Sequence, residues 1–136
     1  MDFAKAFDKV PHGRLLEKLR AKGVGGRLLS WIEEWLNNRT QRVRIGTERS
    51  ESCDVDSGVP QGIVMGPPLF TVYIDDIDKF AEQIDLILKF ADDTKGLQEL
   101  ADKEDWKKLQ GALDGLVEWA RIWGMEFNIK NAKYYT

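Results

Sequence analysis

Two neighbouring acids, Asp92 and Asp93, are the side chains of this 136-residue chain best suited to chemistry. They follow an apolar run, Leu86 to Phe90, that has the composition of a buried strand. Two ionised carboxylates side by side repel each other, and removing either from water is costly unless a cation or a donor compensates. A divalent metal ion supplies that compensation, but a solvated turn after the strand explains the pair equally well.

The composition restricts the kind of metal site. One cysteine, Cys53, excludes an internal disulfide and a thiolate cluster, and one histidine, His12, excludes a two-histidine site. Any metal must therefore be held by carboxylate oxygens, which favours Mg²⁺ or Mn²⁺. With 43% apolar and 32% charged residues, the chain is expected to form one soluble globular domain, over residues 1–136.

Charge is distributed unevenly along the chain. The net charge of −3 argues against a self-sufficient nucleic-acid-binding domain. Nine Lys or Arg and four Glu lie between Arg14 and Arg49, whereas the segment from Asp75 to Asp105 is acidic. A basic flank beside an acidic centre suits a site that holds cations and faces a polyanion, although ordinary surface charge gives the same pattern.

The elements that must position the acids follow from periodicity and turn residues. Apolar residues three and four apart predict helices over 13–22, 27–37, 67–79 and 103–123. Alternation predicts strands over 41–45, 52–55, 85–90, 94–97 and 125–129, with a turn at Glu48–Ser50. The fold class is therefore α+β, with helices packed on one face of a mainly antiparallel sheet. The tryptophans, including Trp106 and Trp123 on the last helix, are expected in the core.

Three sequence blocks occur in one order along the chain. They are DFAKAFD at 2–8, SGVPQG at 57–62, which is followed by GP at 66–67 and LF at 69–70, and FADD at 90–93. Together they resemble the palm region of reverse transcriptases, most closely those of non-LTR retrotransposons of the jockey type. The sequences at 10–12, 38–43 and 123–128 are also similar to that family, so the resemblance covers essentially the whole chain.

The resemblance implies an RNA-directed DNA polymerase that transfers dNTPs onto a primer 3′-hydroxyl, assisted by two Mg²⁺ or Mn²⁺ ions. Asp2 and Asp92 would be the principal ligands of both ions, and Asp93 the third carboxylate. The backbone carbonyl of Phe3 would be an additional ligand. The proximity of Asp2 to Asp92 is implied by the family and not by their separation in the sequence.

The same resemblance implies a dNTP pocket. Phe7 would be the bulky gate that excludes a 2′-hydroxyl, although a phenylalanine at this corner also fits a core position. Gln61 would line the pocket, with Pro60 and Gly62 shaping its loop, because glycine lets the backbone approach a ligand closely. Without the family, this stretch is a plain turn.

The sequence does not decide the roles of several other polar residues. Asp8 fits a helix cap as well as a catalytic part. Asp75 and Asp76 are expected at the surface. Arg42 and Arg44 fit either contacts to template phosphates or a solvated strand face.

The chain departs from the family in what it lacks. Fingers and thumb regions are expected in a larger polyprotein, so the isolated fragment should bind template and primer poorly and be inactive. The family has a lysine, proposed as proton donor to the leaving pyrophosphate, at the position that Asn131 occupies here. That role is unfilled unless Lys130 or Lys133 takes it. A catalytically dead remnant that binds RNA or protein is the alternative, and a nucleotidyl cyclase is a third reading. No membrane association is expected, and the location is intracellular, in the nucleus or a ribonucleoprotein particle for a eukaryotic element.

Overall fold

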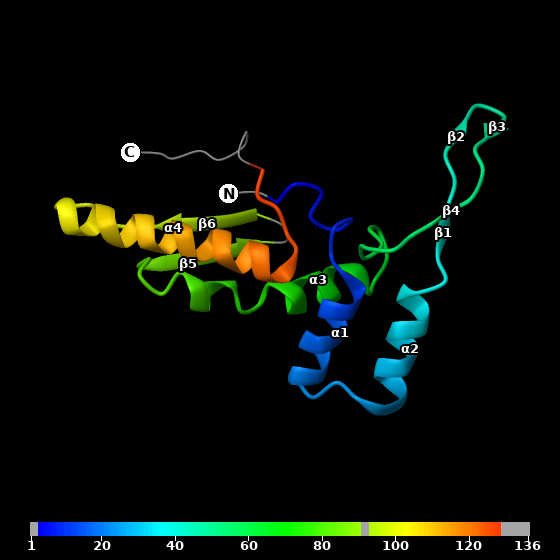
Figure 1. Cartoon of the computed structure of the whole chain (residues 1–136), viewed down its shortest axis with the longest axis horizontal. Coiled ribbons are helices and arrows are strands. Elements are labelled where there is room, and N and C mark those ends of the chain that lie inside the picture. The colour runs from blue at the N-terminus through cyan, green and yellow to red at the C-terminus, as the bar shows by residue number, and fades with distance from the viewer. Residues whose placement is uncertain (1–2, 91–92, 129–136) are drawn as a thin grey trace.

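The computed structural model describes residues 3–90 and 93–128, and combines helices with short strands (Figure 1). The helices in this part of the chain are α1 (His12–Ala21), α2 (Gly26–Leu36), α3 (Gly66–Ile74), the 3₁₀ helix η1 (Ile77–Phe80) and α4 (Lys103–Trp123). The strands are β1 (Thr40–Gln41), β2 (Arg44–Ile45), β3 (Glu48–Arg49), β4 (Cys53–Asp54), β5 (Leu86–Phe90) and β6 (Asp93–Leu97). This mixture confirms the predicted α+β class. None of the described helices is long and apolar enough to cross a membrane.

The strands pair as three small antiparallel sheets, β1 with β4, β2 with β3 and β5 with β6. Two isolated antiparallel bridges, Phe3 with Phe127 and Pro11 with Ser57, connect segments far apart in the sequence. The strands are therefore antiparallel, as predicted, but within the described ranges they do not form one continuous ladder.

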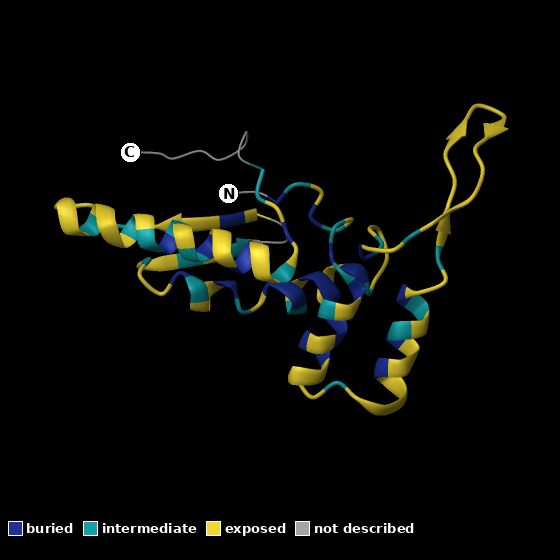
Figure 2. Cartoon of the chain, viewed as in Figure 1, coloured by how far each residue is buried: buried dark blue, intermediate teal, exposed yellow. Residues whose placement is uncertain are grey.

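Residues 40–54 form a ribbon that projects from the body of the molecule (Figure 1). Every residue in it is exposed, and Ile45 retains 78% of its accessible surface (Figure 2). The predicted turn at Glu48–Ser50 is wrong, because Ile45 pairs with Glu48 and the chain reverses at Gly46 and Thr47. Gly46 has a φ of 60°, a left-handed conformation that glycine adopts without a steric penalty.

A capping box and a glycine set the two ends of helix α4. The carboxylate of Asp102 accepts hydrogen bonds from the amides of Glu104 and Asp105, which completes a capping box. Gly124, with a φ of 70°, terminates the helix as predicted. The prediction that the tryptophans lie in the core is only partly right, because Trp106 is 59% exposed while Trp119 is fully buried.

The packing of α4 against η1 requires a small residue. A β-carbon on Gly115 would lie 1.8 Å from the carbonyl oxygen of Phe80, so the two backbones touch directly. η1, which precedes the β5–β6 hairpin in the sequence, is therefore held against α4, the longest of the described helices (Figure 1).

A buried lysine joins three helices. Lys18 of α1 donates to the carbonyl of Tyr73 at the end of α3 and to the carboxylate of Asp76, both at 2.5 Å. Its ammonium also lies 3.8 Å from the ring centroid of Trp123, and the indole of Trp119 donates to Asp76 at 2.8 Å. Burial lowers the pKa of Lys18, and Asp76 opposes that effect.

This network corrects the prediction that both acids after α3 lie at the surface. The helix predicted to run to residue 79 ends at Ile74, and Asp76 turns inward to meet Lys18. Asp75 is exposed as predicted and pairs with Lys22, which lowers its pKa. Asp76 therefore serves as the counter-ion of a buried cation.

Replacing Lys18 with Met should lower the free energy of unfolding by about 3 kcal/mol, because it leaves Asp76 without its cation in a part-buried site. Lys22→Met is the matched control, since its pair with Asp75 is exposed and should contribute less than about 1 kcal/mol. Urea unfolding curves of the two variants measure the difference. Equal losses would contradict a structural role for the Lys18 network.

Candidate active site

Two of the three predicted catalytic acids, Asp2 and Asp92, lie outside the described residues. Asp93 is the first residue of β6, is paired in register with Phe90, and is exposed. Within 3–90 and 93–128, no lysine or arginine forms an ion pair with it, and no three His, Cys, Asp or Glu side chains converge on a metal position. An exposed carboxylate without a protein cation is a chemically suitable ligand for Mg²⁺ or Mn²⁺.

Phe3, the predicted carbonyl ligand, is fixed by aromatic packing. Its side chain is 2% exposed and stacks on Phe127, with ring centroids 4.7 Å apart. It also contacts Trp119 at 5.9 Å and the edge of Phe70 at 6.3 Å. The neighbouring amide of Ala4 donates to the carbonyl of Glu126 at 2.8 Å, so this segment is anchored to the last described one.

Phe7, the predicted gate, is half-buried and stacks on Phe70 of α3. The ring centroids are 4.6 Å apart and the planes are inclined by 26°. Phe70 contacts both Phe3 and Phe7, and is itself fully buried. One aromatic side chain thus connects the segment beside the predicted metal ligands with the predicted nucleotide gate.

Hydrogen bonds join the loop at 57–59 to the segment that carries Phe7. The hydroxyl of Ser57 donates to the carbonyl of Asp8 at 2.9 Å. The amides of Gly58 and Val59 donate to the carbonyls of Val10 and Phe7, each at 2.8 Å. Asp8 therefore contributes through its backbone. The structure brings the predicted gate and the start of the predicted pocket loop together, although about 50 residues separate them in the sequence.

The rest of the pocket loop closes on the start of α3. A β-carbon on Gly66 would lie 2.1 Å from the carbonyl oxygen of Pro60, so only glycine fits there. Pro60 is half-buried, whereas Gln61 and Gly62 are exposed. Gly62 has a φ of 76°. The loop therefore presents Gln61 to solvent while its two ends are held.

Sequence reasoning missed two residues that contact this loop. Arg39 donates to the carbonyl oxygen of Gly58 at 2.5 Å, and Nε2 of His12 lies 2.9 Å from the same oxygen. Burial lowers the pKa of Arg39. The contacts join residues 19 and 46 positions apart, so no local spacing reveals them. The glycine at 58, within a turn-rich stretch, indicates a constrained loop but does not reveal which side chains hold it.

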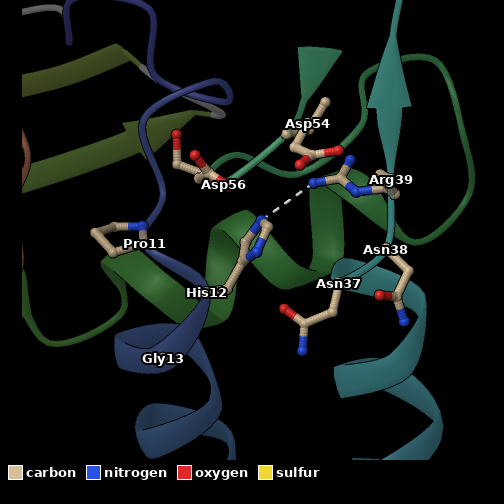
Figure 3. A pocket seen from close by; sticks show the side chains of 10 residues that line it. Pro11, His12, Gly13, Asn37, Asn38, Arg39, Asp54 and Asp56 are labelled. Carbon is tan, nitrogen blue, oxygen red and sulfur yellow. Dashed lines mark hydrogen bonds between the residues drawn. The ribbon is translucent and has the colours of Figure 1, made fainter. Parts of the chain in front are cut away.

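A cavity of about 570 Å³ lies behind the loop, at the base of the ribbon (Figure 3). Its lining is more polar than apolar and includes His12, Arg39, Asp54 and Asp56. None of the predicted site residues within the described ranges lines it. Phe7, Pro60, Gln61 and Gly62, the residues of the predicted nucleotide pocket, are therefore not part of this cavity.

The sequence comparisons identify the family. The profile of the family described as reverse transcriptase (RNA-dependent DNA polymerase) matches residues 1–135. The chain belongs to the reverse transcriptase family. The resemblance on which the site prediction rests is thereby confirmed, and so is the enzyme class to which the family belongs, nucleotidyltransferases.

Individual relatives point to retrotransposons. The chain is 30% identical, over its whole length, to the RNA-directed DNA polymerase from mobile element jockey of Drosophila melanogaster. It is 32% identical over 94% of its length to the jockey polymerase of Drosophila funebris. It is also 27% identical, over 57% of its length, to a Pol polyprotein from retrotransposable element R2 of Popillia japonica. The chain spans only 16%, 15% and 13% of these three relatives.

Gly58→Ala should destabilise this reverse transcriptase domain more than Gly62→Ala. Both glycines have positive φ values, which cost alanine about 1 kcal/mol. A β-carbon at Gly58 would additionally lie 2.7 Å from the carbonyl oxygen of Asp8, whereas one at Gly62 meets nothing within 4 Å. Thermal unfolding should show the larger loss for Gly58→Ala. Similar losses would mean that residues 57–59 are not tightly held against residues 7–10.

Proposed function

We propose that this chain is the palm region of an RNA-directed DNA polymerase, which transfers a deoxynucleotide onto a primer 3′-hydroxyl. The observation that carries the proposal is the hydrogen bond from the amide of Val59 to the carbonyl of Phe7. It joins two sequence blocks of the family, the one with the gate and the one with the pocket loop. A palm sheet assembled around these blocks is part of the proposal.

The metal site of this palm consists of Asp2, Asp92 and Asp93, with the backbone carbonyl of Phe3. Carboxylate oxygens suit Mg²⁺, and Mn²⁺ as its substitute. When bound, the metal stabilises the charge that develops on the reacting phosphate oxygens. The exposure of Asp93 and its lack of a cationic partner within the described chain support its role as a ligand.

The nucleotide pocket is formed by Phe7, Pro60, Gln61 and Gly62. The Phe7 ring excludes a ribose 2′-hydroxyl, and Phe70 supports this role because it stacks on one face of the ring and restricts its movement. Gln61, exposed on a loop with fixed ends, contacts the incoming nucleotide. Because the Phe7 ring is half-buried, it packs against the core and also acts as the gate.

The partners of this palm are a template with its primer, a dNTP, and the fingers and thumb of a larger protein. The chain spans about one sixth of its jockey relatives, which are named as polymerases. We propose an intracellular location, in a ribonucleoprotein particle or the nucleus.

Metal binding should depend on the predicted acids. Titration with Mn²⁺ should broaden the amide resonances at the start of β6, and Asp92→Asn should weaken the apparent affinity by tenfold or more, because it removes a charged ligand. Glu48→Gln on the exposed ribbon removes the same charge elsewhere and should change nothing. An unchanged response in Asp92→Asn would falsify the metal assignment.

We expect the isolated chain to extend a primer little or not at all, since it spans only about one sixth of its jockey relatives. A primer-extension assay with Mg²⁺ and all four dNTPs measures this directly. Efficient extension would contradict the need for fingers and thumb. It would also exclude the alternative of a catalytically dead interaction module.

A further inference from the structure

The carbonyl oxygen of Gly58 is contacted by two side chains, His12 from the start of α1 and Arg39 from the segment between α2 and β1. Nη2 of Arg39 lies 2.5 Å from this oxygen and Nε2 of His12 lies 2.9 Å from it. The two nitrogens are 3.1 Å apart (Figure 3). A carbonyl oxygen has two lone pairs, so it accepts from both when the proton of His12 is on Nε2.

Both donors are themselves held in place. Nε of Arg39 donates at 3.0 Å to the carbonyl of Leu36, one of the last carbonyls of α2, and its guanidinium lies 5.9 Å from the ring of Trp35. His12 is the first residue of α1 and is only 8% exposed. The contact therefore fixes Gly58 to two helices and not to mobile side chains.

Gly58 has no freedom to move independently. Its amide donates to the carbonyl of Val10, and the next amide, of Val59, donates to the carbonyl of Phe7. Its φ of 90° and the backbone of Asp8, 2.7 Å from the position of a β-carbon, leave one conformation. The donors on its carbonyl add to these contacts in holding Val59, and the loop that follows it, against the gate.

We infer that Arg39 and His12 are positioning residues of the nucleotide pocket, which hold Gly58 and thereby set the distance between the Gln61 loop and Phe7. This inference rests on the proposed function. Both side chains line the cavity, of which Phe7, Pro60, Gln61 and Gly62 are not part, so they act on the nucleotide through Gly58 and not by direct contact. They act on nucleotide affinity and on the exclusion of ribonucleotides, while the metal site at β6 is unaffected.

The variants separate this role from a general contribution to folding. Arg39→Met removes the donor but keeps most of the side-chain volume, and Arg39→Lys retains one donor. His12→Leu removes the ring nitrogen, whereas His12→Gln retains an amide donor. Arg42→Met, at an exposed arginine of the ribbon that follows Arg39, is the control for lost positive charge.

Two kinds of dissociation constant are measured, those of dTTP and UTP in the presence of Mg²⁺ and that of Mn²⁺ alone. Each titration is monitored through the amide resonances of the folded protein. We expect Arg39→Met and His12→Leu to weaken dTTP binding at least fivefold and to reduce the preference for dTTP over UTP at least threefold. Mn²⁺ affinity should change less than twofold. Arg39→Lys and His12→Gln should recover part of the loss, and Arg42→Met should behave as wild type.

Three outcomes would overturn the inference. One is unchanged dTTP affinity and unchanged preference in folded Arg39→Met and His12→Leu. Another is an equal loss of dTTP and Mn²⁺ binding, which indicates a merely structural role. The third is amide hydrogen exchange at Gly58 and Val59 that is no faster in Arg39→Met than in wild type. A wild-type chain that binds Mn²⁺ but no dTTP contradicts the proposed nucleotide pocket itself, so the two failures are distinguishable.

Discussion

The attachment of residues 57–59 to residues 7–10 is the constraint on which the candidate site depends. Two amide hydrogen bonds and one hydroxyl hydrogen bond hold the segments together. Each contributes about 1 kcal/mol, but together they define one register. The left-handed Gly58 makes that register possible, because no larger residue fits against Asp8. This contact brings the gate and the start of the pocket loop together.

Aromatic packing extends the constraint toward the metal side. Phe70 lies between Phe3 and Phe7, so α3 supports both segments with one buried ring. At the end of α3, Lys18 ties that helix to Asp76 and the tryptophans of α4. The predicted site therefore rests on helices whose relative positions are fixed by a buried cation.

The sequence predicted local features well and distant contacts poorly. The bounds of α1 and α4 follow from periodicity and from Gly124, which are properties of neighbouring residues. Trp106 was misplaced, because periodicity assigns a face but does not show where the partner surface ends. The contacts of Arg39 and His12 with Gly58 required the tertiary fold. The prediction of a catalytic role for Asp93 came from family resemblance, since an acid pair after a strand also fits a solvated turn.

The central claim is that Phe7 and the loop at Gln61 form one side of a deoxynucleotide pocket. Intermolecular nuclear Overhauser effects between dTTP and the protein, recorded with Mg²⁺, test it most directly. The account predicts cross-peaks from the 2′ protons of the sugar to the ring of Phe7, and from the nucleotide to the Gln61 side chain. Cross-peaks to the His12 ring in the cavity, with none to Phe7, would contradict it.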